Sequence, residues 1–204
     1  MRIGLIGDVH AEDRHLETAL TQLTAAKVDA VLCVGDIVDG LGSVNRCVAL
    51  LLEHGVRCVR GNHEDWLFRG VARNVRDATQ LQDLDRASKE FLASLPETLE
   101  VATPEGTLLL CHGLGSNNMA RIGAEEFSYT GVTSNHPELQ RVLRAAGRYR
   151  FVVSGHSHRN YLRVFEGVTF VNTGTLKAGH APGYAVLDTF ENELKWNRLT
   201  AWID

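Results

Sequence analysis

The sequence predicts an α/β fold that begins with a parallel sheet, and the order of its strand-like and helical segments is the first reason. Apolar strand-like runs cover residues 2–8, 28–34 and 56–59, with helical segments between them. This β-α-β-α-β order is typical of parallel strands joined by right-handed crossovers. The second reason is that polar residues directly follow each of these strands, where open parallel sheets bind their ligands. The tail of the chain is rich in strands.

The helices are predicted from apolar spacing and from residues that start or end a helix. Leu16, Leu20 and Leu23 are spaced for one face of a first helix. Glu12 and Asp13 at its start interact favourably with the positive N-terminal end of a helix. A second helix is predicted over 44–52. The remaining predicted helices cover 65–73, 80–95 (ended by Pro96) and 137–146 (begun by Pro137).

The second half of the chain supplies further strands, with hairpin signals at Gly167 and at Glu191-Asn192. Residues 113–135 are instead polar and irregular, and an irregular segment of that length is usually functional or mobile. The predicted strands of this half cover 99–101, 107–111, 151–153, 161–165, 168–171, 184–187 and 194–199.

Length and composition indicate an ordinary globular protein. The 204 residues are expected to form a single domain over 1–204, with enough chain for a sizeable core. Hydrophobic residues make up 44% and charged residues 23% of the sequence. The formal net charge of −4 gives no basic excess, so a large nucleic-acid footprint is not favoured.

The four cysteines have no CxxC spacing, and three of them lie in apolar strand-like runs. They are interpreted as small buried hydrophobic residues rather than as metal ligands or a disulfide framework. The N-terminus becomes acidic too early for a signal peptide, and no run approaches the roughly 18 apolar residues that a membrane span needs. We therefore expect a cytoplasmic protein without membrane contact, and the oligomeric state is left open.

The strand ends release a set of oxygen and imidazole ligands with no thiolate. Such donors suit divalent ions of intermediate hardness, such as Mn, Fe or Zn, better than Ca or Cu(I). Seven donors exceed what one ion takes while leaving room for substrate, so they suit two ions that share a carboxylate. Two ions about 3.5–4 Å apart can clamp a phosphoryl group for in-line displacement. The candidate ligands are Asp8, His10, Asp36, Asn62, His112, His156 and His158.

Five short motifs carry a resemblance to the calcineurin-like metallophosphoesterase superfamily, in particular to its small single-domain bacterial branch. Each motif alone is weak, but all five follow a predicted strand and occur in the order of that family. The resemblance implies two mixed β-sheets packed face to face, flanked by helices, with a dinuclear site at the strand ends. The motifs are Asp8-x-His10, Gly35-Asp36-x-x-Asp39, Gly61-Asn62-His63-Glu64, His112-Gly113 and Gly155-His156-x-His158.

The same resemblance implies a role for each matching residue. Asp36 corresponds to the carboxylate that bridges two ions, which we expect to be Mn, with Fe or Zn as alternatives. His63 corresponds to the residue that contacts the phosphate and protonates the leaving group. The ligands of one ion correspond to Asp8, His10 and His158, and those of the other to Asn62, His112 and His156.

The surroundings of His63 leave two questions open. Its acidic orienting partner is either Asp39, which we place with His63 in the catalytic set, or Glu64. Arg60 is a candidate for phosphate binding together with Asn62 and His63, but an ordinary salt bridge explains it about as well. Further substrate contacts are considered among residues of the irregular segment, namely Asn117, Asn118 and Tyr129.

The implied function is hydrolysis of a phosphomonoester or phosphodiester by a metal-bridging hydroxide. Small bacterial enzymes of this branch often have Gly-Asn-Cys-Asp at the third motif, whereas this chain has Gly-Asn-His-Glu. The difference is in the direction of the protein-phosphatase and dinucleoside-polyphosphatase pattern. A phosphoprotein or dinucleoside polyphosphate phosphatase is therefore an alternative. Two alternatives come from other classes. A binding module without turnover is disfavoured because the set of ligands is complete, and a nuclease is disfavoured because the net charge is acidic.

The remaining histidines and the single motifs also fit ordinary structural roles. Taken alone, each motif fits a polar loop or a helix cap, and only their joint occurrence makes that interpretation weak. His15 and His54 are expected to be solvated helix residues, and His136 and His180 to lie in loops.

Overall fold

The protein is described by a computed structural model with two five-stranded sheets as its centre. The structure describes residues 1–74, 77–121, 127–128, 131–132, 137–145 and 147–200. The expected pair of mixed sheets with flanking helices is confirmed.

The first sheet has the strand order β12-β11-β1-β2-β3. Strands β1, β2 and β3 are parallel, as the opening of the sequence predicts, with Ile3 opposite Ala30 and Leu32 opposite Arg57. The C-terminal hairpin extends this sheet antiparallel to β1. Its strands are β1 (Arg2–Ile6), β2 (Ala30–Cys33), β3 (Arg57–Cys58), β11 (Gly183–Asp188) and β12 (Glu193–Arg198).

The second sheet has the strand order β4-β5-β8-β10-β9. Its central strands β5, β8 and β10 are parallel, and a hairpin strand closes each edge. Its strands are β4 (Thr98–Thr103), β5 (Gly106–Cys111), β8 (Tyr149–Ser154), β9 (Asn160–Phe165) and β10 (Val168–Thr173).

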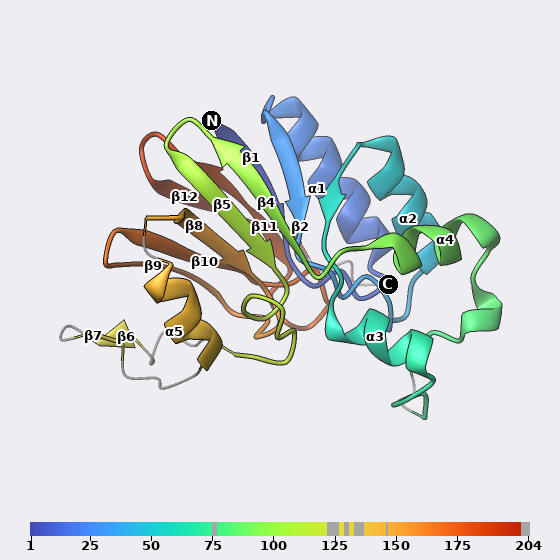
Figure 1. The fold of residues 1–204 in the computed structure, drawn as a ribbon. Coiled ribbons are helices and arrows are strands. Elements are labelled where there is room, and N and C mark those ends of the chain that lie inside the picture. The colour runs from blue at the N-terminus through green and yellow to red at the C-terminus, as the bar shows by residue number, and fades with distance from the viewer. Residues whose placement is uncertain (75–76, 122–126, 129–130, 133–136, 146, 201–204) are drawn as a thin grey trace.

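Helices cover the outer face of each sheet, which gives four layers (Figure 1). Helices α1, α2 and α4 lie on the first sheet, and α5 lies on the second. Three apolar clusters fill the spaces between layers, and the one between the sheets includes Leu5, Leu32 and Phe151. The helices are α1 (Asp13–Ala25), α2 (Val44–Glu53), α3 (Asn62–Arg69), α4 (Arg86–Ser94) and α5 (Pro137–Arg144), with a 3₁₀ turn η1 (Leu81–Asp83).

Two predicted helices have wrong boundaries. Helix α3 begins at Asn62 instead of residue 65 and ends at Gly70, whose φ of 66° is left-handed. The predicted helix at 80–95 is a 3₁₀ turn followed by α4, because the Asp85 side chain accepts the Ser88 N–H and starts the helix there. Both starts carry a capping residue that apolar spacing alone overlooks.

The irregular segment predicted at 113–135 is only partly described. It contains a short antiparallel pair, β6 (Phe127–Ser128) and β7 (Gly131–Val132). Tyr129 and His136, considered above, lie outside the described residues.

Two further predictions concern buried residues. All four cysteines are free and buried, as expected for small hydrophobic residues. The expectation for His15 is wrong, since it is buried on α1, where its Nδ1 lies 3.2 Å from Glu12 Oε2. Among the described residues, no helix has both the length and the apolar character to cross a membrane.

Candidate metal centre

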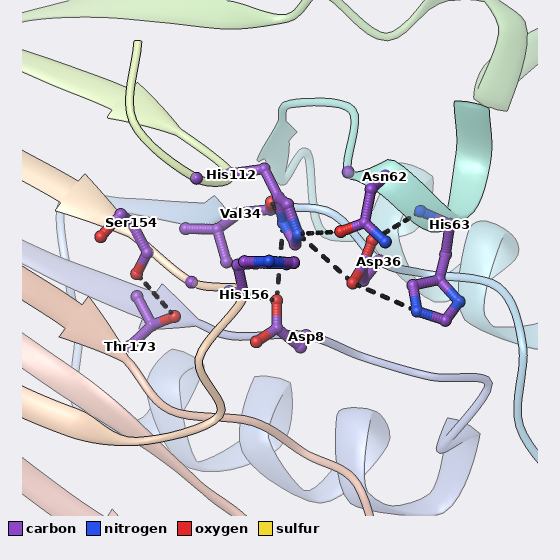
Figure 2. Close-up of polar contacts among 12 residues, drawn as sticks. Asp8, Val34, Asp36, Asn62, His63, His112, Ser154, His156 and Thr173 are labelled. Atoms are coloured by element: carbon purple, nitrogen blue, oxygen red, sulfur yellow. Dashed lines mark hydrogen bonds and ion pairs between the residues drawn. The ribbon is translucent and has the colours of Figure 1, made fainter. Parts of the chain in front are cut away.

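The C-terminal ends of five strands bring the predicted ligands to one place. Asp8 follows β1, Asp36 follows β2 and Asn62 follows β3, all in the first sheet. His112 and His156 follow β5 and β8 of the second sheet. Because the sheets are packed face to face, these ends meet where the two layers touch, as Figure 2 shows. The site thus draws on both sheets.

The backbone around the site is held in a rarely used conformation. A left-handed φ occurs at Asp36 (47°) and at Asp39 (68°), without a glycine to ease it. Each such residue costs about 1–3 kcal/mol, and it persists only where the surrounding structure fixes it. The other site residues with a left-handed φ are His10, His156 and His158.

Two glycines let the backbone approach the carboxylates closely. A Cβ atom on Gly61 would lie 2.1 Å from Asp36 Oδ1, and one on Gly155 would lie 2.7 Å from Asp8 Oδ1. Both contacts are far shorter than van der Waals distance. The position of the Asp36 carboxylate therefore requires a glycine at residue 61, and that of the Asp8 carboxylate requires one at residue 155.

Five of the predicted ligands form the buried part of the site, which we call the floor. At its centre His112 Nε2 lies 2.9 Å from Asn62 Oδ1 and 3.3 Å from Asp36 Oδ2 (Figure 2). The other ring nitrogen, Nδ1, lies 2.8 Å from the Val34 carbonyl, to which it donates its proton. The floor residues, each at most 2% exposed, are Asp8, His10, Asp36, Asn62 and His112.

His10 is oriented in the same way as His112. Its Nδ1 donates to the Asp39 carbonyl at 3.0 Å, so its Nε2 carries the lone pair. That Nε2 lies 3.0 Å from His158 Nε2, which in turn lies 3.7 Å from Asp8 Oδ2. A backbone carbonyl that fixes the tautomer of a histidine in this way is a common feature of metal ligands.

Three histidines form the partly exposed part of the site, which we call the rim: His63, His156 and His158. The side chains of His63 and His158 are 22% and 21% exposed. His158 Nδ1 lies 3.2 Å from Nδ1 of His180, a residue of the loop before β11. The rim is therefore the side from which a substrate can approach.

The orienting partner of His63 is Asp39. His63 Nδ1 donates to Asp39 Oδ2 at 2.7 Å. The Arg73 guanidinium donates to both oxygens of the same carboxylate, from Nη1 to Oδ1 and from Nη2 to Oδ2, each at 2.8 Å. The Thr79 N–H also donates to Asp39 Oδ1, at 2.8 Å. The ring of Trp66 packs against that of His63, with 4.6 Å between centroids.

Glu64, the other candidate for that role, is a buried backbone anchor. Its carboxylate accepts the N–H groups of Asp36 and Ile37 at 3.0 and 2.6 Å, and those of Val38 and Gly61 at 3.1 and 2.8 Å. It therefore shapes the loop that presents Asp36, and the Gly61 contact also closes the start of α3.

The buried acids attract positive charge. Burial raises the pKa of Asp8 to about 7. Burial also acts to raise the pKa of Asp36, but His112, His63 and His10 together outweigh it and the net pKa is lowered. Burial alone would lower the pKa of His112, yet the carboxylates of Asp36 and Asp8 raise it to about 10.

The other histidines are shifted in different directions. Burial lowers the pKa of His10 and of His156 to about 4, and that of His158 to about 3. These three rings are therefore neutral at pH 7, which is the form that binds metals. Burial also acts against the charged form of His63, but its contact with Asp39 is the largest of the effects that together raise its pKa.

The donor set fits a divalent cation. His112 Nε2, Asn62 Oδ1 and Asp36 Oδ2 converge. The raised pKa of His112 means that its Nε2 is protonated at pH 7 without a cation, and binding of a metal ion would displace this proton while the Nδ1 proton stays on the Val34 carbonyl. Asp8 Oδ2 and His156 Nε2 are buried and have no hydrogen-bond partner among the described residues. A metal ion satisfies both the converging lone pairs and the orphaned atoms.

Two groups of possible ligands share Asp36. One consists of Asp36, His112 and His156, and the other of Asp36, His10 and His63, with all ligand atoms of each group within 4.8 Å of one another. The first group agrees with the set expected from the sequence. In the second group, His63 accompanies His10 where Asp8 and His158 were expected. His158 Nε2 nevertheless lies 3.0 Å from His10 Nε2, and Asp8 Oδ2 lies 3.7 Å from His158 Nε2.

The candidate substrate contacts outside the centre are placed less favourably. Arg60 Nη1 lies 3.6 Å from Asp65 Oδ1, the salt bridge that was considered as the alternative. Asn118 donates to Asp65 Oδ2 at 2.7 Å. Sequence reasoning missed Arg73 and Thr79, which carry no local motif, and it did not connect Trp66 with His63.

Comparisons with known proteins agree with this geometry. A family model described as "Calcineurin-like phosphoesterase superfamily domain" matches residues 1–192. The serine/threonine-protein phosphatase 2 of Escherichia coli is 22% identical over 208 residues, which cover 90% of this chain and 92% of that protein.

Solved structures show the same fold. A metallophosphoesterase from Sphaerobacter thermophilus superposes with a TM-score of 0.71 at 22% identity, over 99% of this chain and 90% of the other. A phosphoesterase from E. coli superposes with a TM-score of 0.56 at 16% identity, over 98% and 100% of the two chains.

Proposed function

The chain belongs to the calcineurin-like phosphoesterase superfamily and is a phosphoesterase hydrolase, and from this membership we propose that it hydrolyses phosphomonoesters or phosphodiesters at a dinuclear metal centre. The observation that carries the proposal is the position of Asp36, which belongs to both groups of possible ligands. A carboxylate between two ligand sets is what a bridging ligand requires.

We assign the residues to two ions that share Asp36. When bound, two divalent ions supply Lewis acidity, which activates a water molecule as nucleophile and neutralises charge on the phosphoryl oxygens. Mn is the ion we expect, with Fe or Zn as alternatives. The residues that would hold one ion are Asp8, His10 and His158, and those that would hold the other are Asn62, His112 and His156.

His63 acts on the leaving group in this proposal. Its Nδ1 proton is held by Asp39, so its Nε2 faces the centre, 3.8 Å from Asp36 Oδ2. A protonated Nε2 there donates its proton to the departing oxygen as the bond to phosphorus breaks. General acid catalysis of this kind contributes about 10²–10⁴-fold to the rate.

A phosphoprotein is the second candidate substrate class. The motif Gly61-Asn62-His63-Glu64 and the similarity to a protein named as a serine/threonine-protein phosphatase favour a monoester over a diester. The single-domain organisation over 1–204 and the cytoplasmic location stay predictions.

The proposal is tested by turnover of p-nitrophenyl phosphate and bis-p-nitrophenyl phosphate, with Mn²⁺ added to the purified protein. We expect hydrolysis of at least one of them, faster for the monoester, and none in the matched Asp36→Asn variant. Elemental analysis of the same preparation identifies the ions. Absence of turnover on both compounds by protein that carries metal would overturn the proposed function for simple esters.

A further inference from the structure

A cavity of about 400 Å³ lies beside the rim of the metal centre. His158, a rim residue, forms part of its wall. The volume falls within the range of about 300–1,000 Å³ that is usual for small-molecule sites. The other residues that matter for its chemistry are Arg159, Asn160, His180, Trp196, Asn197 and Arg198.

The topology places this cavity at the same end of the two sheets as the metal centre. Asn160 begins β9, and β9 is antiparallel to β10, whose end supplies Thr173 to the wall. In the first sheet, the start of β11 and the end of β12 lie beside the carboxyl end of β1. The contact of 3.2 Å between His158 Nδ1 and His180 Nδ1 joins the cavity wall to the rim.

The lining of the cavity is cationic although the protein is acidic. Arg159 and Arg198 contribute two guanidinium groups, and among the described residues no aspartate or glutamate lines the cavity. In the described part of the chain, neither guanidinium has an ion-pair partner, whereas Arg73, Arg141 and Arg148 each pair with a carboxylate. Two unpaired arginines around a cavity, on a chain of net charge −4, are suited to an anion.

Further groups of the wall add polar contacts to this charge. Asn160 and Asn197 offer side-chain amides, and His180 offers an imidazole on the loop between β10 and β11. Lys177 of the same loop is close enough to lower the pKa of His10 and His158 electrostatically. The positive charge therefore continues from the cavity to the metal centre.

We propose that this cavity binds a second phosphate group, carried by the leaving group of the substrate. The proposal rests on the proposed function, and it narrows the substrate class to phosphoesters or phosphoanhydrides with two phosphates. In the reaction, a water oxygen bonds to the phosphorus at the metal centre and the bond from that phosphorus to the leaving oxygen breaks. The leaving oxygen takes a proton, and the second phosphate departs with it.

The matched substrates ADP and AMP test this assignment. Both carry adenosine, but only in ADP does the group that leaves the terminal phosphate bear another phosphate. For the double variant Arg159→Ala/Arg198→Ala we expect the ratio of kcat/KM for ADP to that for AMP to fall at least about tenfold, mainly through KM. Turnover of p-nitrophenyl phosphate should stay within about twofold, since the variant leaves the metal centre intact.

The matched control removes two exposed arginines elsewhere, in Arg86→Ala/Arg163→Ala. It lowers the net charge by the same amount, and the ratio of ADP to AMP should not change. An unchanged ratio in the cavity variant, or an equal fall in the control, would overturn the assignment. Absence of turnover on p-nitrophenyl phosphate in the unmodified protein would instead contradict the proposed function.

A binding measurement tests the cavity without turnover. Titration calorimetry of the Mn²⁺-loaded protein compares imidodiphosphate, which resists hydrolysis, with inorganic phosphate. We expect imidodiphosphate to bind more tightly than inorganic phosphate. In the cavity variant Arg159→Ala/Arg198→Ala, the ratio of the two dissociation constants should fall at least about tenfold. The same preference in the variant as in the unmodified protein would overturn the assignment.

Discussion

The floor of the metal centre is held by the backbone, whereas its rim is held by side chains and loops. In the floor, His112 and His10 donate to the carbonyls of Val34 and Asp39, and Glu64 fixes the loop that carries Asp36. In the rim, His63 depends on Asp39 and Arg73, and His158 contacts a loop histidine. The floor is thus part of the fold, while the rim can change without unfolding it.

This difference indicates how each part contributes to function. Groups that are almost fully buried are oriented once, during folding, and they suit the permanent binding of ions. Partly exposed groups can reach a substrate, and their surroundings decide which leaving group is accepted. Substitutions in the floor should therefore change stability and metal content together. In the rim, substitution of the proposed ligands His156 and His158 should lower metal content with little loss of stability, and substitution of His63 should change turnover.

The largest effect is expected for Asp36→Asn in the floor. The amide keeps the size of the side chain but removes the negative charge that both ligand groups share. We expect a loss of at least about 10³-fold in kcat/KM on p-nitrophenyl phosphate, with less metal bound. Circular dichroism serves as the control for folding. A folded variant with turnover within tenfold of the unmodified protein would show that Asp36 is no bridging ligand.

The second effect is a difference in the free energy of unfolding between two variants, His112→Ala in the floor and His158→Ala in the rim. The first substitution leaves two buried carboxylates without their cationic neighbour, so the free energy of unfolding should fall by about 3 kcal/mol. The second removes a partly exposed ring and should cost less than about 1 kcal/mol. Urea unfolding in EDTA measures both, with the exposed His54→Ala as the matched control. Equal losses for His112 and His158 would remove the distinction between floor and rim.

The third effect concerns His63→Ala in the rim. Since this residue is proposed as the proton donor, turnover should fall by about 10²-fold while metal content stays near that of the unmodified protein. Elemental analysis and steady-state kinetics on one preparation measure both quantities. Because His63 also lies in a ligand group with His10 and Asp36, loss of metal would instead make it a ligand.

The smallest effect is expected for Arg73→Lys, behind the rim. Lysine keeps the charge but cannot form the two parallel hydrogen bonds to Asp39. We expect about a tenfold loss on phenyl phosphate and less on p-nitrophenyl phosphate, whose better leaving group needs less protonation. Arg69→Lys is the matched control. An equal loss on both substrates would mean that Arg73 supports the loop and not the orientation of His63.

Most of the floor could be predicted from the sequence, because four of its five residues follow strands whose order is local. The β-α-β-α-β opening places Asp8, Asp36 and Asn62 at one sheet edge. The approach of His112 and His156 from the other sheet depends on packing between layers, and only the resemblance of their motifs indicated it. Gly61 and Gly155 mark the same site in the sequence, since the carboxylates of Asp36 and Asp8 approach these residues too closely to leave room for a side chain.

The support of the rim could not be predicted in the same way. Arg73 lies after the left-handed Gly70 that ends α3, and it reaches Asp39 through a loop that has no periodic pattern. Nothing local distinguishes it from a surface arginine. The choice between Asp39 and Glu64 also needed the fold, because both carboxylates lie near His63 and only their hydrogen bonds tell them apart.

The central claim is that two ions share Asp36, and the number of ions bound per chain tests it most directly. The purified protein is loaded with Mn²⁺, desalted, and analysed for metal and protein in the same sample. We predict about two ions per chain. A single ion per chain, in protein that hydrolyses p-nitrophenyl phosphate at its full rate, would contradict the dinuclear centre.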